Sequence, residues 1–171
     1  MIVVCDSSAL INLSKIHQLC LLESMFGGVL ISPGIHDEVV KKGEGRAGAK
    51  EVEEADFIQV QSLRNPDDVQ LYTDQLSQED AELIVVAKEQ KADLIITRDR
   101  GLRRRAQREG IEVVNLIALF ESAKKRGNIE SVKTLLDELR DKGVLIREGV
   151  YREALRRAGE LEDDKDTIDH Q

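Results

Sequence analysis

The sequence predicts an α/β protein, a three-layer α/β/α sandwich built around a central parallel sheet. Short β-branched runs alternate with helical patterns along the 171 residues, and this alternation is typical of parallel strands joined by helices. The clearest run, Leu94 to Ile96, is continuously apolar and therefore reads as a buried strand. It ends at Thr97 and Asp99. In an open α/β sheet, ligand-binding and catalytic residues lie just beyond the carboxyl ends of such strands.

The composition predicts a globular protein without a membrane segment. Hydrophobic residues make up 41% of the chain, and no apolar run approaches the roughly 18 residues that span a bilayer. The N-terminal residues lack a basic segment followed by a cleavage site, so no signal peptide is apparent. Cys5 and Cys20 stand in apolar surroundings, which favours reduced, buried thiols. We therefore expect a cytoplasmic protein.

The charge distribution favours an enzyme that acts on phosphates over a protein that coats nucleic acid nonspecifically. The net charge is −8, and the acidic C-terminal stretch 160–171 accounts for most of it. Six arginines, in contrast, crowd into the eleven residues that follow Thr97: Arg98, Arg100, Arg103, Arg104, Arg105 and Arg108. An acidic centre with a local basic rim suits a metal-dependent reaction at a phosphate.

The first half of the chain begins with a strand over residues 2–5, which ends at Asp6. A helix follows from residue 9 and is expected to continue to about residue 25, before a second strand over 29–31. Ser32 and Pro33 then form a strong helix-start signal for residues 33–42. Glu38 falls on the apolar face of this helix, where a carboxylate is costly unless it is paired or bound to a cation.

The middle of the chain contains the longest predicted helix, residues 77–91, with Ser77 as its N-cap. It follows a glycine-rich loop over 43–48, a short helix over 50–55, a third strand over 57–60 and a helix over 67–76. The glycine-rich loop lacks the preceding strand and the following Lys-Ser/Thr of a phosphate cradle. Helical periodicity alone does not choose among Glu79, Asp80 and Glu82 as the inward-facing acid.

The last part of the chain is mainly helical. An arginine-rich helix over 102–109 and a strand over 112–114 precede helices over 116–126, 129–142 and 148–159. We divide the chain into a body (1–120), a helical extension packed on it (121–160) and a mobile acidic tail (161–171). Apolar positions on the extension favour a homodimer, although these helices could fold back on the sheet instead.

Four carboxylates stand in suggestive places: Asp6 and Asp99 beyond strand ends, and Glu38 and Asp80 on inward-facing helix surfaces. Each has a plain alternative role, as a helix cap, a partner of the helix dipole or one half of an ion pair. Four such groups brought together without buried cations repel one another unless a metal ion neutralises them. Carboxylates are the ligands that Mg²⁺ and Mn²⁺ prefer.

These residues also carry a family resemblance. The sequence resembles the PIN-domain ribonucleases of the VapC-like toxin group, in a branch with a helical C-terminal extension. Four short motifs carry it: Asp6-Ser7-Ser8-Ala9-Leu10-Ile11-Asn12, Ser32-Pro33 with Glu38-Val39, Glu79 to Ile84, and Thr97-Arg98-Asp99. Two positions depart from the pattern, since the branch often has glycine-glutamate at Glu79-Asp80 and Asn or Asp at Arg98.

The resemblance implies a metal-dependent endoribonuclease in which Asp6, Glu38, Asp80 and Asp99 are the catalytic residues and hold Mg²⁺ or Mn²⁺. It assigns the third acid to Asp80. Ser7, Ser8 and Thr97 would orient these ligands, and three arginines would contact RNA phosphates: Arg100, Arg103 and Arg104. The implied role is the toxin of a type II toxin–antitoxin pair, whose partners are RNA, a small antitoxin and a second copy of the chain.

Two other functions are alternatives to the nuclease. A regulatory module on the same fold would bind RNA or protein without cleaving it, and its binding would be indifferent to a chelator. A small phosphatase usually needs Asp-x-Asp after the first strand, and Ser8 occupies the second position here. His17 and His36 are interpreted as incidental rather than as general bases.

Overall fold

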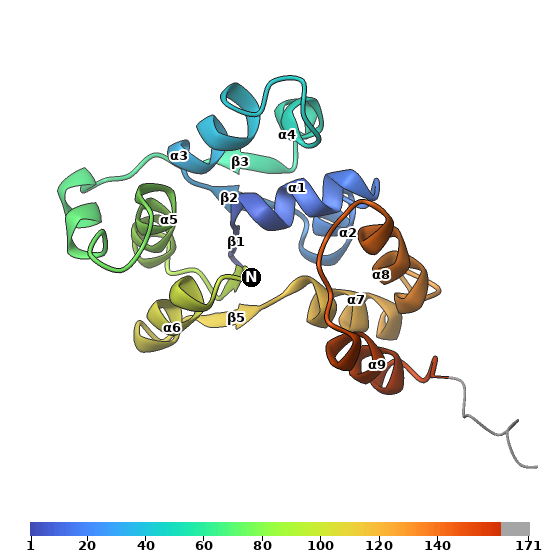
Figure 1. The fold of residues 1–171 in the computed structure, drawn as a ribbon. Helices are drawn as coiled ribbons and strands as arrows, with labels where there is room; N and C mark the ends of the chain where they lie inside the picture. The colour runs from blue at the N-terminus through green and yellow to red at the C-terminus, as the bar shows by residue number, and fades with distance from the viewer. Residues whose placement is uncertain (162–171) are drawn as a thin grey trace, which may run out of the picture.

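A parallel sheet forms the centre of the fold in the computed structural model, which describes residues 1–161. Its strand order is β3-β2-β1-β4-β5, and Figure 1 shows helices on both sides of it. This arrangement confirms the predicted α/β/α sandwich. The strands are β1 (Val3–Cys5), β2 (Val29–Ile31), β3 (Ile58–Val60), β4 (Leu94–Ile96) and β5 (Glu112–Val114).

The two central strands, β1 and β4, are the most completely buried strands of the sheet. Every residue of β1 and β4 is buried, whereas the outermost strands β3 and β5 are partly exposed. Val3, Val4 and Cys5 pair in register with Leu94, Ile95 and Ile96. A parallel strand covered by helices on both faces must be apolar on both, which explains the unbroken apolar run that identified β4.

Helices cover the sheet on its two faces. α5 (Gln78–Glu89) and α6 (Arg100–Arg108) lie on one side, while α1 (Ser7–Lys15) and α2 (Leu21–Phe26) lie on the other (Figure 1). α3 (Pro33–His36) and α4 (Ala49–Glu54) lie near β2 and β3 at the top of the view. Among residues 1–161, no helix combines the length and apolarity needed to cross a membrane.

Three C-terminal helices pack against one another beside α1 and α2: α7 (Leu116–Lys125), α8 (Val132–Asp141) and α9 (Glu148–Arg157). The apolar face of α8, made of Val132, Leu135, Leu136 and Leu139, is buried in the same core as the sheet. These residues therefore need no second chain to cover them, and the homodimer stays a prediction. The domain boundary at residue 120 also stays a prediction, and residues 162–171 of the expected mobile tail lie outside the described residues.

Three local predictions differ from the structure. The helix expected to run to residue 25 stops at Lys15, and His17 adopts a left-handed conformation with φ of +55° before α2 begins. No glycine or proline marks this break, so the helical pattern concealed it. The helix expected over 67–76 is a 3₁₀-helix, η2 (Pro66–Leu71). Cys20 is exposed rather than buried.

The helix that starts at Ser32 changes its geometry part-way. Ser32 Oγ accepts a hydrogen bond from the N–H of Ile35, and Pro33 occupies the first turn, as expected. Beyond α3, the segment Asp37–Lys41 winds as a π-helix, η1, in which the N–H of Lys42 donates to the carbonyl of Asp37. Such π-helical turns are rare and are frequently found at functional sites. This one carries Glu38.

Candidate metal centre at the carboxyl edge of the sheet

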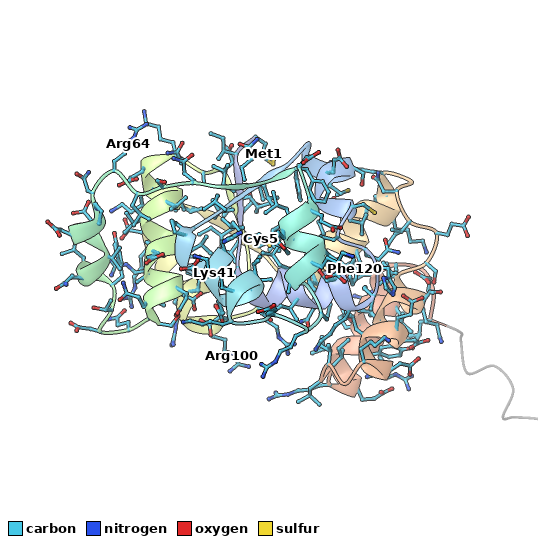
Figure 2. The ribbon with its side chains drawn as sticks, turned by 90° about the horizontal axis from the view of Figure 1, so that it is seen from above. Met1, Cys5, Lys41, Arg64, Arg100 and Phe120 are labelled. Atoms are coloured by element: carbon cyan, nitrogen blue, oxygen red, sulfur yellow. The ribbon has the colours of Figure 1, made fainter. Side chains whose placement is uncertain are left out.

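The carboxyl ends of all the parallel strands meet at one edge of the sheet. Figure 2 shows Arg100, just beyond β4, and Met1, just before β1, on opposite edges with Cys5 between them. The chain goes from β1 to β2 and β3 on one side, and β4 and β5 lie on the other. The direction of winding therefore reverses between β1 and β4, which is where open α/β sheets bind ligands.

Asp6 lies at this reversal, directly after β1, and is 3% exposed. Its Oδ1 accepts a hydrogen bond from the N–H of Ala9 at 2.8 Å, and its Oδ2 accepts one from the hydroxyl of Thr97. Burial raises the pKa of Asp6, these hydrogen bonds oppose the rise, and the negative charges of Asp99 and Glu38 add to it. Asp6 thus caps α1 while it faces other carboxylates.

Asp99 is joined to Asp6 through Thr97. The hydroxyl of Thr97, 2% exposed, accepts a hydrogen bond from the N–H of Asp99 at 3.0 Å while it donates to Asp6. Oδ1 of Asp99 accepts from the N–H of Leu102 at 2.8 Å, so Asp99 is the N-cap of α6. One threonine between two adjacent strand ends therefore holds both aspartates in place.

Asp80 is the acid of α5 that interacts with the other carboxylates. Burial raises its pKa, and the charges of Asp6, Asp99 and Glu38 raise it further, to about 6. The two other candidate acids of α5, Glu79 and Glu82, contact groups outside the cluster. Glu79 lies 3.9 Å from Nζ of Lys42, and Oε2 of Glu82 accepts a hydrogen bond from the N–H of Gly34. The geometry therefore favours Asp80 over Glu79 and Glu82.

Glu38 is half-buried on the π-helix η1. Its negative charge raises the pKa of both Asp6 and Asp80. Four acids from separate segments of the chain thus lie close enough together to interact electrostatically. We call them the carboxylate cluster: Asp6, Glu38, Asp80 and Asp99. Within residues 1–161, none of the four forms an ion pair with a lysine, arginine or histidine.

The donor set of the cluster fits Mg²⁺ or Mn²⁺, because it offers carboxylate oxygens and lacks a paired cation. In the part of the chain described, however, no three His, Cys, Asp or Glu side chains are arranged to hold one ion. Asp6 and Asp99 are turned toward the helix N-termini that they cap. Binding of a shared ion therefore requires these side chains to rotate toward one another.

The predicted supporting residues divide into two groups. Thr97 contacts both aspartates as described, whereas the hydroxyls of Ser7 and Ser8 form no hydrogen bond with the carboxylate cluster among the described residues. Arg100, Arg103 and Arg104 are all exposed on α6, and only Arg100 and Arg103 line a groove beside the cluster. Their contact with RNA stays a prediction.

Sequence reasoning overlooked two polar residues in that groove, Asn12 and Glu121. Asn12 belongs to the first motif and lies about two turns from Asp6 along α1. This spacing could have predicted that Asn12 lies near the site. Glu121 lies in the C-terminal helices, and no pattern in the sequence points to it.

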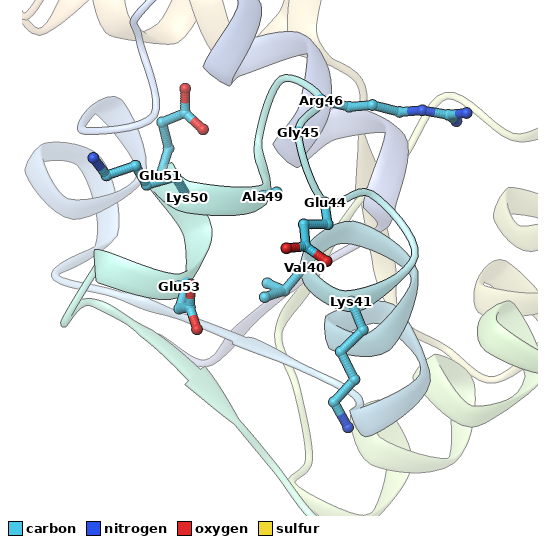
Figure 3. Close-up of a pocket in the computed structure, with 9 residues that line it drawn as sticks. All are labelled: Val40, Lys41, Glu44, Gly45, Arg46, Ala49, Lys50, Glu51 and Glu53. Atoms are coloured by element: carbon cyan, nitrogen blue, oxygen red, sulfur yellow. The ribbon is translucent and has the colours of Figure 1, made fainter.

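A separate hollow of about 490 Å³ lies at the glycine-rich loop (Figure 3). Three basic and three acidic residues line it, and the side chain of Arg46 extends away from it. No member of the carboxylate cluster lines this hollow. Its balanced charge does not favour a phosphate, in agreement with the motif missing from the sequence.

Comparison with known proteins identifies the family. The family model DUF3368, described as a PIN domain, matches residues 2–160. The chain belongs to this PIN-domain family. PIN domains are usually nucleases and generally use divalent metal ions. None of the curated proteins compared with the chain matches it.

The match also concerns the C-terminal helices. The PIN-domain model includes α7, α8 and α9, so the helices of the extension belong to the family pattern.

Proposed function

We propose that this PIN-domain protein is an endoribonuclease that requires Mg²⁺ or Mn²⁺ and acts as the toxin of a type II toxin–antitoxin pair. The observation that carries the proposal is the carboxylate cluster. Four acids from distant segments gather at the winding reversal of the sheet, with no ion-pair partner among residues 1–161, and burial together with the charges of the other acids raises the pKa of Asp6 and of Asp80. Such an arrangement is unfavourable for folding, and it becomes favourable when a cation is bound.

The four residues of the cluster would hold the ion. When bound, it supplies Lewis-acid polarisation of the phosphodiester and lowers the pKa of the attacking water. The chain contributes the positioning: Thr97 fixes Asp6 and Asp99, and α1 and α6 begin at these two residues. Their N-terminal N–H groups carry partial positive charge toward the site, which favours an anionic phosphate.

The toxin role, the antitoxin partner and a cytoplasmic location are parts of this proposal that come from the resemblance to the VapC-like group. An RNA substrate agrees with the exposed arginines of α6, Arg100, Arg103 and Arg104, which lie just beyond Asp99. The chain has no tryptophan, two tyrosines and three phenylalanines, so base stacking is a small part of recognition.

Cleavage of a labelled single-stranded RNA by the full chain tests the proposal, with Mg²⁺, Mn²⁺ or EDTA present. We expect cleavage only with metal, and a loss on the order of 100-fold or more in Asp6→Asn. This variant keeps an oxygen that can cap α1 at Ala9. Asp56→Asn makes the same change at an exposed residue before β3, near the opposite edge of the sheet, and serves as the control.

Thermal melting with and without the two ions provides an independent test. Wild type should melt at a higher temperature with Mg²⁺ or Mn²⁺, because a ligand that binds only the folded state stabilises it. Asp99→Asn should lose most of this shift. If wild type shows neither the shift nor cleavage, and binds RNA equally well in EDTA, the regulatory-module alternative replaces the nuclease.

A further inference from the structure

A groove of about 990 Å³ lies between the carboxyl edge of the sheet and the C-terminal helices. Ser8 and Thr97 line one wall, and residues of α8, α9 and the connection between them line the other. Thr97 is hydrogen-bonded to Asp6. The groove therefore begins next to the carboxylate cluster.

The lining of the groove is rich in arginine. Its charged residues are Arg98, Arg100, Arg103, Arg147 and Arg157, against Glu121 and Glu153. Glu153 is already paired with Arg157 at 3.0 Å, whereas Arg100, Arg103 and Arg147 form no ion pair with any residue between 1 and 161. Leu116 and Ile117, in the first turn of α7, also line it. Free arginines and a helix N-terminus both favour an anionic ligand.

Two polar groups in the groove have no partner. Asn12 is 7% exposed, and its side-chain amide makes no hydrogen bond with the rest of the described chain. Oε1 of Glu121 is buried and likewise has none. Buried polar atoms are nearly always hydrogen-bonded. The buried oxygen of Glu121 needs a donor, and the Asn12 amide, which lines the same groove, both donates and accepts, so together they indicate a ligand with hydroxyl groups.

We propose that the groove binds the ribose–phosphate backbone of single-stranded RNA next to the carboxylate cluster. Arg100, Arg103 and Arg147 bind phosphates, and Asn12 and Glu121 bind ribose 2′-hydroxyls. The 2′-hydroxyl is both a donor and an acceptor and distinguishes RNA from DNA. This inference rests on the proposed ribonuclease function and extends it, because it assigns part of the substrate site to the C-terminal helices.

The composition of the groove favours RNA backbone over bases. No Phe, Tyr or Trp lines it, so it offers no stacking platform. Exposed Leu145 and Val150 on its rim make a second copy of the chain the main rival occupant. Unpaired arginines and the buried oxygen of Glu121, which needs a donor, favour the nucleic acid.

Fluorescence anisotropy in EDTA tests the phosphate contacts without cleavage, using oligouridine RNA of about twelve nucleotides. Arg147→Glu should weaken binding by about tenfold and make its salt dependence shallower. Arg152→Glu makes the same charge change at an exposed position of α9 outside the groove, and should bind like wild type. Equal affinity of the two variants overturns the proposal.

A second comparison, with oligodeoxyuridine of the same length, tests the 2′-hydroxyl contacts. Wild type should bind RNA several-fold more tightly than DNA, and Glu121→Ala should reduce this preference by lowering RNA affinity more than DNA affinity. Equal affinity of wild type for the two polymers overturns this assignment. Melting curves of each variant show whether it is folded.

The outcomes separate this inference from the proposed function. If RNA is not cleaved with metal, but Arg147→Glu still weakens binding in EDTA, the nuclease proposal fails and the groove remains an RNA site. If RNA is cleaved while Arg147→Glu binds like wild type, only the groove assignment fails. If light scattering shows a wild-type dimer that Arg147→Glu dissociates, with RNA binding unchanged, the groove is an interface between copies and the RNA proposal is overturned.

Discussion

Oε2 of Glu82 accepts a hydrogen bond of 2.8 Å from the N–H of Gly34, and so joins α5 to the first turn of α3. Asp80 precedes Glu82 by two residues, and Glu38 follows α3 on the π-helix. Glu82, which is not a member of the cluster, therefore joins the two helical segments that carry Asp80 and Glu38. A Cβ added to Gly34 would lie 2.5 Å from this oxygen, so glycine is needed for this close approach.

Glu82→Ala should lower the free energy of unfolding by about 1 kcal/mol, because the N–H of Gly34 loses its partner. Glu82→Gln keeps an acceptor oxygen and should retain most of the stability. Urea denaturation measures both. Gly34→Ala should cost less in the Glu82→Ala background than in wild type, since the clash is then absent. Additive effects in this double-mutant cycle would contradict the coupling.

Thr97→Val should destabilise the protein by about 2 kcal/mol, although valine has almost the same shape. The change removes the donor to Oδ2 of Asp6 and the acceptor for the N–H of Asp99, and both groups are at least partly buried. Thr97→Ser keeps the hydroxyl and should recover most of the loss. Chemical denaturation in EDTA separates this effect from metal binding, and equal stability of the two variants would show that the hydroxyl is unimportant.

Asp80→Asn should stabilise the metal-free protein and abolish its response to metal. A folded-state pKa of about 6 means that folding disfavours ionised Asp80 at neutral pH. Removing the charge should therefore add about 1 kcal/mol in EDTA at pH 7.5, after allowance for solvent screening. Melting curves with EDTA and with Mn²⁺ provide the measurement. A less stable metal-free variant would argue that Asp80 is a structural cap.

Glu160 should make the C-terminal helices sensitive to acid. Burial acts to raise the pKa of Glu160, but hydrogen bonds from Ser131, Lys124 and the N–H groups of Val132 and Lys133 outweigh it and lower the pKa to about 2. The carboxylate therefore stabilises the fold above its unfolded pKa, and this contribution is lost as the pH falls toward 2.

At pH 7, Glu160→Gln should cost on the order of 2 kcal/mol. The difference from wild type should shrink between about pH 4.5 and pH 2 as the wild-type carboxylate is protonated. Glu148→Gln, at an exposed residue of α9, should change stability by less than about 0.5 kcal/mol. A difference between Glu160→Gln and wild type that is constant over this pH range would rule out the charge of Glu160 as its cause.

Much of the fold could be predicted from local signals. Ser32 and Ser77 cap helices where their residue types predicted it, because a side-chain oxygen beside a free N–H is a local interaction. β5 has the predicted bounds. The break at His17 escaped prediction because it depends on how the chain packs, and Ile16 is buried there. The exposure of Cys20 follows from the same break.

The sequence alone determined the order of the strands and helices, and the positions of Asp6, Glu38, Asp80 and Asp99 after strands or on helices. These properties depend on periodicity and capping, which act over a few residues. The tertiary structure decided which acid of α5 faces the others, the π-helix under Glu38, and the groove that joins α7 and α9 to the edge of the sheet. Such features depend on side chains that are far apart along the chain, and only packing determines which of them meet.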